Sequence, residues 1–201
     1  MYKYVPEKER KMLHKECLGI IHSVQDYLRN YFTFDIKLIG SGEARLVTRN
    51  NNSEFDLDYN LILQRDKQGL INRPEAIKNL FLEAFNNHKN LFKFAQNSTS
   101  VIKSRLVLNN SLYFSFDIAI LVEGNNGNYL KLVFDKGSER FIWNEIRNSR
   151  NSIGRFKRLK EDGYFIKFKN RYIELKNMHL IRNEDIGSYA IFIETLNDLG
   201  Y

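Results

Sequence analysis

The sequence predicts a mixed α/β fold in which helices pack on a mixed β-sheet, followed by a small basic region toward the C-terminal end. Three observations predict this class: an amphipathic stretch near the start, several apolar or alternating runs in the middle, and an excess of Lys and Arg after residue 135. The chain has 201 residues, of which 43% are hydrophobic and 13% aromatic, so it can bury a sizeable core.

Helix-like and strand-like patterns alternate in the first half of the chain. Apolar residues recur at helical spacing over residues 7–30, and residues 74–91 are predicted to form a second long helix that begins at a proline. Between them, residues 34–40 and 54–63 are predicted strands and residues 42–48 a short helix.

The second half begins with three strand-like runs that are separated by Asn- and Gly-rich turn sequences. These runs cover residues 100–108, 112–123 and 128–135. Residues 164–175 are predicted to form a β-hairpin. Residues 183–199 are predicted to form a final helix capped by Asn183.

The run "EFDLDYNLIL", residues 54–63, places two acids in an apolar strand. Because residues two apart point to the same side of a strand, Asp56 and Asp58 project together, and such close carboxylates repel unless they share a cation. Asp117, in the apolar run "YFSFDIAIL", is a third acid of this kind. Magnesium prefers oxygen ligands, and carboxylates on neighbouring strands can hold two ions for displacement at phosphorus. We therefore predict a Mg²⁺ or Mn²⁺ site at these three aspartates.

A glycine–serine turn, "IGSGEAR", comes shortly before the paired acids. Gly40 and Gly42 permit a tight turn, and Ser41 adds a hydroxyl at a predicted helix start, where exposed N–H groups can bind phosphate. We therefore predict that Gly40 and Ser41 bind the phosphates of a nucleotide. Arg45 lies in the polar segment that follows and can reach over the phosphates; an exposed loop arginine is the alternative.

Together these motifs resemble the DNA polymerase β-type nucleotidyltransferase superfamily, whose pattern is a hydrophobic residue, Gly, Gly or Ser, a variable spacer, and Asp-x-Asp flanked by apolar residues. Here the pattern is formed by Ile39, Gly40, Ser41, Asp56, Leu57 and Asp58. The family's third acid matches Asp117, and the resemblance extends over residues 10–135. It implies a nucleotidyltransferase fold and transfer of a nucleoside monophosphate from a nucleoside triphosphate to an acceptor hydroxyl, with release of pyrophosphate.

The resemblance also implies a role for each site residue. Asp56 and Asp58 would bind both metal ions, and Asp117 would bind the catalytic ion and help to activate the acceptor hydroxyl. Gly40 and Ser41 would hold the triphosphate. The plainer alternative is that the three aspartates are solvated, or paired with lysines, on a half-exposed sheet.

The C-terminal third carries the excess positive charge of a chain whose net charge is +7. Between Lys136 and Arg182 there are 13 Lys and Arg against 5 Asp and Glu. This asymmetry indicates an anionic partner, with a solvated basic face as the simpler alternative. We expect residues 1–135 to form the catalytic core, and residues 136–201 to pack on it and bind the acceptor.

The predicted acceptor is RNA, in particular transfer RNA, because basic side chains neutralise its phosphates. The predicted contacts are Arg150, Arg155, Lys157 and Arg158, on a helix anchored by Phe156 and Leu159. Trp143 is either a core anchor or a platform for a base. Three alternatives stay open: a small-molecule acceptor, as for antibiotic adenylyltransferases; a second nucleotide, as for cyclic-dinucleotide synthases; and a non-catalytic nucleic-acid-binding module.

Composition also suggests where the protein works. No apolar run is long enough for a transmembrane helix, the charged start does not resemble a signal peptide, and a single cysteine suits a reducing cytoplasm. The compact size suggests a toxin–antitoxin or defence enzyme, which is an analogy at the level of the fold. Its expected partners are therefore a nucleoside triphosphate, an acceptor, and an antitoxin or a second copy of the chain, with no membrane.

Overall fold

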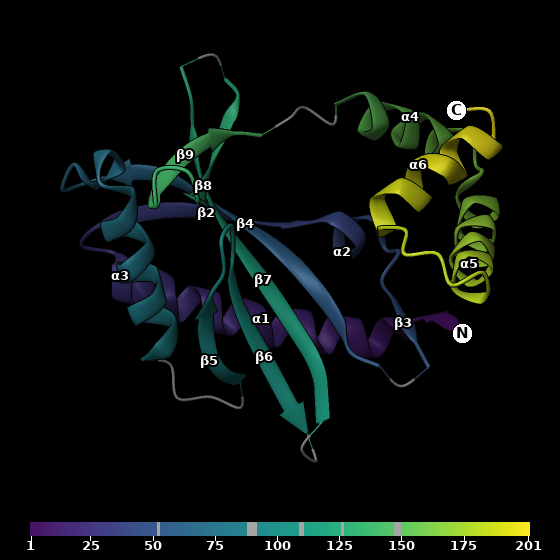
Figure 1. The fold of residues 1–201 in the computed structure, drawn as a ribbon, viewed down its shortest axis with the longest axis horizontal. Coiled ribbons are helices and arrows are strands. Elements are labelled where there is room, and N and C mark those ends of the chain that lie inside the picture. Colours follow the sequence, from purple (N-terminus) through teal and green to yellow (C-terminus); the bar gives the residue numbers. More distant parts are fainter. Residues whose placement is uncertain (52, 88–91, 109–110, 126, 147–149) are drawn as a thin grey trace. The chain divides into compact units, whose positions relative to one another are not determined.

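The computed structural model describes residues 1–51, 53–87, 92–108, 111–125, 127–146 and 150–201. These residues divide into two compact units, shown as a ribbon in Figure 1. The sheet unit comprises residues 5–47 and 53–146, and the helical unit comprises residues 1–4, 48–52 and 147–201.

The sheet unit is built on a seven-stranded mixed sheet within the described residues. Its strands are β2 (Phe32–Ile39), β4 (Phe55–Asp66), β5 (Phe92–Asn97), β6 (Ile102–Leu108), β7 (Ser111–Glu123), β8 (Tyr129–Asp135) and β9 (Arg140–Glu145). The order is β2-β4-β7-β6-β5, and β8 joins one end of β7 and carries β9 on its far side. Only the central pair, β4 and β7, is parallel among these described pairings.

Two helices, α1 (Glu7–Leu28) and α3 (Pro74–Asn86), pack against each other and bury one face of the sheet. Helix α1 contributes a stripe at helical spacing, as the sequence predicted: Leu13, Cys17, Ile20, Ile21, Val24 and Leu28. The sheet contributes Phe55, Leu57 and Tyr59 from β4, and Phe114, Phe116 and Ile118 from β7, all buried. Because strand residues alternate, the residues between them face the opposite side.

Short elements complete the sheet unit. Helix α2 (Gly40–Ala44) directly follows β2, and a 3₁₀ turn, η1 (Leu70–Asn72), precedes α3. No helix among the described residues is long and apolar enough to cross a membrane.

The helical unit contains α4 (Arg150–Glu161), α5 (Phe165–Ile181) and α6 (Ser188–Asp198), with a two-stranded ribbon of β1 (Tyr2–Tyr4) and β3 (Thr48–Asn50). Its core is aromatic: the ring of Phe156 lies 5.0 Å from those of Phe168 and Phe192. The ribbon is fastened to α5, since the Tyr4 hydroxyl donates to the Lys169 carbonyl over 2.7 Å. Segments far apart in sequence therefore share this small unit.

The predicted mixed sheet and the helices at residues 7–30 and from residue 74 are confirmed; residues 88–91 of the second prediction lie outside the described part. The hairpin predicted over residues 164–175 is wrong, because this segment lies in α5. Its buried residues recur every three or four positions: Phe168, Tyr172, Leu175, Lys176 and His179. The interleaved Lys and Arg look like strand alternation, but the burial period is helical.

Three boundaries also differ from the prediction. The short helix predicted over residues 42–48 is α2, which covers Gly40–Ala44. Asn183 does not cap the last helix, since α6 begins at Ser188 and Asn183 has a positive φ of 54° just after α5. The compact units divide near residue 147 and not at 135, because β9 pairs with β8 along its length and extends the sheet. The strands β1, β3, β5 and β9 were not predicted.

Candidate active site

The three predicted aspartates lie on neighbouring strands and on the face of the sheet that α1 and α3 leave uncovered. Asp58 on β4 is directly opposite Asp117 on β7 in the parallel register, and Asp56 is opposite Ser115. Asp56 is exposed, whereas Asp58 and Asp117 are half-buried. Beyond them, the same face is closed by a small apolar cluster around Ile62, Ala119 and Leu121. The acids therefore form a row that is exposed to solvent at Asp56 and bordered by apolar side chains at its other end.

Burial and mutual repulsion perturb the acids. Burial, followed by the charges of Asp56 and Asp117, raises the pKa of Asp58 to about 6. Burial also raises the pKa of Asp117, although the Lys103 ammonium beside it opposes the shift. For both acids, burial outweighs the favourable charges of Lys103 and Lys131, and a divalent cation would relieve the remaining cost of ionisation.

Two lysines that sequence reasoning missed face these acids. Lys103 on β6 is directly opposite Asp117 in the antiparallel register, and its Nζ lies 3.5 Å from Asp117 Oδ1. Lys131 on β8 is half-buried; burial lowers its pKa while the charges of Asp58 and Asp117 hold it up. Strand alternation in "VIKSRLVL" and "NYLKLVFD" is the signal that could have placed both lysines, but only with the register known.

One carboxylate oxygen is left poorly satisfied. Within the described residues, Asp117 Oδ1 is buried and accepts no hydrogen bond. At 3.5 Å the Lys103 contact is an ion pair and not a well-formed hydrogen bond. A buried anionic oxygen without a hydrogen bond is costly, so this atom is a position where a cation would be strongly stabilised.

The donor set fits a hard divalent cation such as Mg²⁺ or Mn²⁺. Asp56, Asp58 and Asp117 supply carboxylate oxygens, which these ions prefer, and one of those oxygens lacks a hydrogen bond. Among the described residues, no three His, Cys, Asp or Glu side chains already converge as a finished metal site. The carboxylates would have to turn toward a shared ion, and their repulsion opposes this turn until the ion is present.

The Gly-Ser turn approaches these acids closely. Ile39, the last residue of β2, is opposite Asp58, so Gly40 begins α2 beside that carboxylate. Gly40 has a φ of +62°, and a Cβ there would lie 3.3 Å from Asp58 Oδ2. The turn closes where the Leu46 N–H donates to the Ser41 carbonyl over 2.9 Å, and Ser41 is half-buried. The structure thus brings Gly40 next to Asp58, with Ser41 following in the same turn.

Arg45 stands apart from this cluster in its contacts. It is exposed, it adopts a left-handed conformation with a φ of 61°, and its N–H donates to the Gly42 carbonyl at the end of α2. The pKa of Glu7 at the start of α1 is lowered mainly by its hydrogen bond with Lys11, and the charge of Arg45 adds a small further lowering. No described contact joins Arg45 to the aspartates, so its role at a nucleotide stays a prediction.

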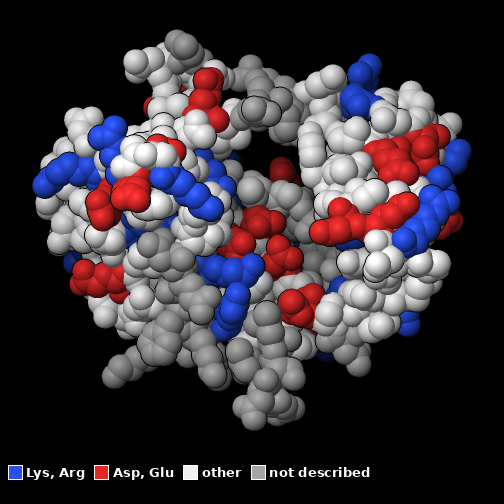
Figure 2. All heavy atoms as spheres, viewed as in Figure 1, with Lys and Arg blue, Asp and Glu red and all other residues white. Residues whose placement is uncertain are grey.

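The predicted acceptor-binding residues have mixed surroundings. The Arg155 guanidinium donates to Asn197 Oδ1 and to the Tyr201 carbonyl, so it ties α4 to the end of the chain. Lys157 is exposed and pairs with Glu161 over 3.7 Å, Arg158 is exposed, and the side chain of Arg150 lies outside the described part. Figure 2 shows acidic and basic side chains intermingled on the visible face of the helical unit. This face is not an unbroken basic surface.

Trp143 is a core anchor, one of the two alternatives that the sequence left open. Its indole Nε1 donates to the Ile71 carbonyl over 2.8 Å, and the ring packs against the main core. This contact fastens β9 to η1.

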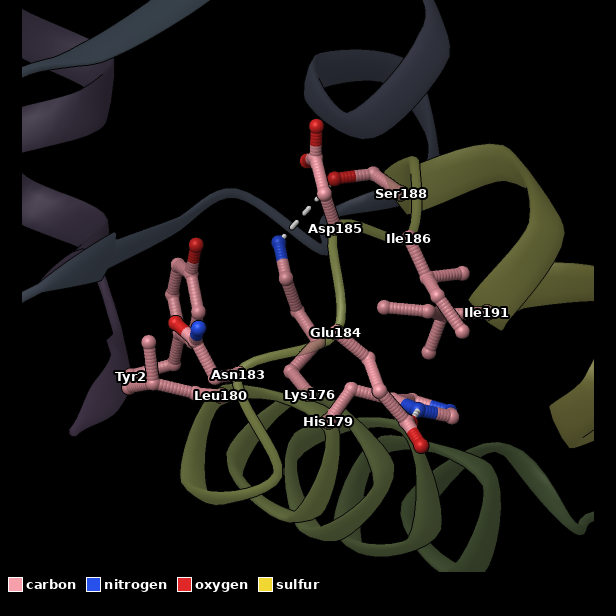
Figure 3. Close-up of a pocket in the computed structure, with 10 residues that line it drawn as sticks. All are labelled: Tyr2, Lys176, His179, Leu180, Asn183, Glu184, Asp185, Ile186, Ser188 and Ile191. Atoms are coloured by element: carbon pink, nitrogen blue, oxygen red, sulfur yellow. Dashed lines mark hydrogen bonds and ion pairs between the residues drawn. The ribbon is translucent and has the colours of Figure 1, made fainter.

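A separate cavity of about 250 Å³ lies within the helical unit (Figure 3). The buried Lys176 ammonium lines it and donates to Thr48 Oγ1 over 2.8 Å and to Ser188 Oγ over 3.1 Å. His179 also lines it, and its imidazole contacts Glu184 at 2.5 Å and Glu194 at 2.8 Å. These contacts join β3, α5, α6 and the segment between the two helices, which gives the polar lining a structural role.

The chain combines a mixed sheet, acids on adjacent strands and a Gly-Ser turn, and comparison with solved structures confirms the predicted nucleotidyltransferase fold. The chain is similar to a STING-associated CdnE c-di-GMP synthase from Capnocytophaga granulosa, with 18% identity, a TM-score of 0.66, and coverage of 97% of this chain and 61% of that chain. It is also similar to the Vibrio cholerae cyclic AMP-GMP synthase DncV in complex with a linear intermediate, with 10% identity, a TM-score of 0.66, and coverage of 96% and 67%.

A third similar structure is the Bradyrhizobium diazoefficiens CD-NTase CdnG in complex with GTP, with 15% identity, a TM-score of 0.53, and coverage of 76% of this chain and 42% of that chain. The chain thus spans about three-fifths of the length of the CdnE structure and about two-thirds of that of DncV. No protein-family model and no curated protein sequence matches it. At these identities the comparisons establish the fold.

Proposed function

We propose that this chain catalyses divalent-metal-dependent transfer of a nucleoside monophosphate from a nucleoside triphosphate to an acceptor hydroxyl. The observation that carries the proposal is the row of carboxylates, with Asp58 opposite Asp117 on parallel strands and Gly40 in contact range of Asp58. The similarity to solved nucleotide synthases supports it.

In the proposed reaction, the acceptor oxygen forms a bond to the α-phosphorus while the bond from that phosphorus to the bridging oxygen of the β-phosphate breaks. Pyrophosphate leaves with the electron pair of the broken bond. The proton of the acceptor hydroxyl passes to the carboxylate of Asp117, which is opposite Asp58 on the neighbouring strand. Asp56 and Asp58 would hold the divalent cations, and Gly40 and Ser41 would hold the triphosphate.

A bound divalent cation would supply positive charge at the phosphate oxygens and orient the triphosphate for in-line displacement. The chain's contribution is to gather three carboxylates on one face and to keep the other face dry. The apolar cluster around Ile62, Ala119 and Leu121 closes one end of the row and limits the access of water there.

We propose a second nucleotide as the acceptor. Two of the similar structures are named as synthases of cyclic dinucleotides, and one holds a linear intermediate of two joined nucleotides. RNA, the acceptor predicted from charge, has less support, because Arg155 is engaged within the helical unit and the visible surface of that unit is mixed in charge. The cytoplasmic location and the antitoxin or second-copy partner stay predictions.

The test incubates the chain with α-labelled ATP, CTP, GTP or UTP, alone and in pairs, with Mg²⁺ or Mn²⁺. We expect release of pyrophosphate and formation of a labelled dinucleotide, both lost in Asp58→Asn. Asp35→Asn is the matched control, because Asp35 is an exposed acid on the neighbouring strand β2 and is bonded to Gln64.

The outcomes separate the two parts of the proposal. Label that enters added RNA and no dinucleotide would confirm the transfer and refute the nucleotide acceptor. Absence of pyrophosphate release with every nucleotide pair, both ions and added RNA would refute nucleotidyl transfer by this chain.

A further inference from the structure

Lys103 lies beside Asp117 Oδ1, a buried carboxylate oxygen that accepts no hydrogen bond within the described residues. Its strand position, directly opposite Asp117, places the ammonium 3.5 Å from Asp117 Oδ1. That oxygen is also a donor in the proposed metal site. An ammonium and a divalent cation repel each other, so both cannot approach the same oxygen closely at once.

Lys103 and Lys131, the two lysines beside the acids, differ in how readily their ammonium groups can move away from the carboxylates. The Lys103 side chain is 32% exposed, against 19% for Asp117, so its ammonium can turn into solvent while the acid stays in place. Lys131 is on β8, which is paired on both sides, with Leu121 of β7 opposite it on one side and Asn144 of β9 on the other. Lys131 forms no direct ion pair with any described carboxylate, and it acts on Asp58 and Asp117 at longer range.

We propose that Lys103 is an intramolecular counter-ion of Asp117, which a divalent cation has to displace before it can bind. The proposal rests on the proposed function, since it takes Asp117 as a metal ligand. Lys103 is thus a positioning residue: in the metal-free chain it holds Asp117 against the repulsion of Asp58. Lys131 remains as a fixed positive charge that limits how tightly the acids attract cations.

The proposal predicts the direction in which loss of the Lys103 charge changes the affinity for a divalent cation. Removal of the Lys103 charge leaves the acids more negative and removes the competitor, so the divalent cation should bind more tightly. An ion pair of this exposure is worth up to about 1 kcal/mol, which corresponds to a roughly two- to fivefold gain in affinity. Added salt should shrink the difference, because it screens a partly exposed charge.

The experiment titrates the full chain with Mn²⁺ and follows free Mn²⁺ by electron paramagnetic resonance, without nucleotide. We expect Lys103→Met to bind Mn²⁺ roughly two- to fivefold more tightly than the unchanged chain, and Lys103→Arg to restore the original affinity. Lys11→Met is the matched control, because Lys11 and Glu7 form an exposed ion pair on α1, and the Mn²⁺ affinity of this variant should not change. Lys131→Met should also tighten binding, by a smaller factor.

The result that overturns the proposal is equal or weaker Mn²⁺ binding by Lys103→Met while Asp117→Asn still weakens binding; the metal site then stands without the counter-ion. Lack of Mn²⁺ binding by the unchanged chain refutes both the counter-ion and the proposed metal site. Circular dichroism of each variant checks its fold, and Lys103→Gln, which keeps a polar side chain, provides the same test if the methionine variant does not fold.

Discussion

Gly42 allows the turn that carries Gly40 and Ser41 to pack onto the sheet. It is buried, and a Cβ added there would lie 2.8 Å from Leu38 Cδ1 and 3.0 Å from Leu57 Cδ2. The side chain of Leu38 is half-buried and can shift to make room for the added Cβ. Leu57 is fully buried beneath α1, so its side chain cannot shift in the same way. Overpacking of a core costs typically about 1–3 kcal/mol, and with one movable neighbour we expect Gly42→Ala to cost about 1–2 kcal/mol.

The chain offers a clean assay for this prediction. It has a single tryptophan, Trp143, which anchors β9 in the sheet unit and therefore reports the unfolding of that unit by fluorescence. For a protein of this size the expected loss corresponds to a fall in melting temperature of roughly 2–8 °C. In Gly19→Ala, on α1, the added Cβ meets nothing within 4 Å, so this control should be unchanged or more stable. A Gly42→Ala chain as stable as the original would show that the close contact does not constrain the turn.

Three further predictions concern titration and side-chain contacts. The folded-state pKa of Asp58, about 6, is above that of an unfolded aspartate, so this group contributes stability at low pH that is lost as the pH rises toward 6. Urea titrations without metal should therefore show Asp58→Asn to be more stable above pH 6, by on the order of 1 kcal/mol. Equal stability would contradict the cost of burying the ionised Asp58 carboxylate beside Asp56 and Asp117. Arg155→Ala should destabilise the helical unit by about 1–2 kcal/mol in circular dichroism melts, because it removes two hydrogen bonds; unchanged melting with weaker RNA binding would instead restore its role at an acceptor. Two glutamates raise the pKa of His179, so its contribution to stability is present below pH 6.5 and lost as the pH rises through the higher folded value. His179→Gln should remove this pH dependence, which we expect to be at most about 1 kcal/mol because both glutamates are more than a third exposed; an unchanged profile would assign the dependence to other groups.

The parts of the site that follow from local pattern could be predicted from the sequence. Alternation in one strand is enough to place Asp56 and Asp58 on a common face, because the side-chain period of a strand is fixed. A lone acid between buried Phe116 and Ile118 marks Asp117 in the same way. The turn at Gly40 follows from residue type, since its φ of +62° is a conformation that glycine adopts readily.

The parts of the fold and the site that depend on tertiary pairing could not be predicted from the sequence. In α5, Lys and Arg alternate with apolar residues over a short segment, so strand and helix periods both fit, and the packing of Phe168 and Tyr172 against the rest of the helical unit decides between them. The ribbon of β1 and β3 joins residues nearly fifty positions apart, for which a three-residue strand gives no local signal. The internal role of Arg155 depends on the position of the chain's last residue, Tyr201, which charge counting ignores.

The pairing of Lys103 with Asp117 depends on a one-residue change in the register between β6 and β7. Near the turn between β6 and β7, Leu108 is opposite Ser111 and Val107 opposite Leu112; if this register continued, Ile102 would be opposite Asp117. The register changes by one residue between Leu106 and Val107, so that Leu106 is opposite Phe114 and Lys103 is opposite Asp117. A bulge of this kind re-aims side chains beyond it, because a one-residue slip moves every side chain to the other face. This change of register therefore keeps Ile102 in the core and places the Lys103 ammonium beside the Asp117 carboxylate. It is the structural reason that Asp117 has Lys103 as its counter-ion.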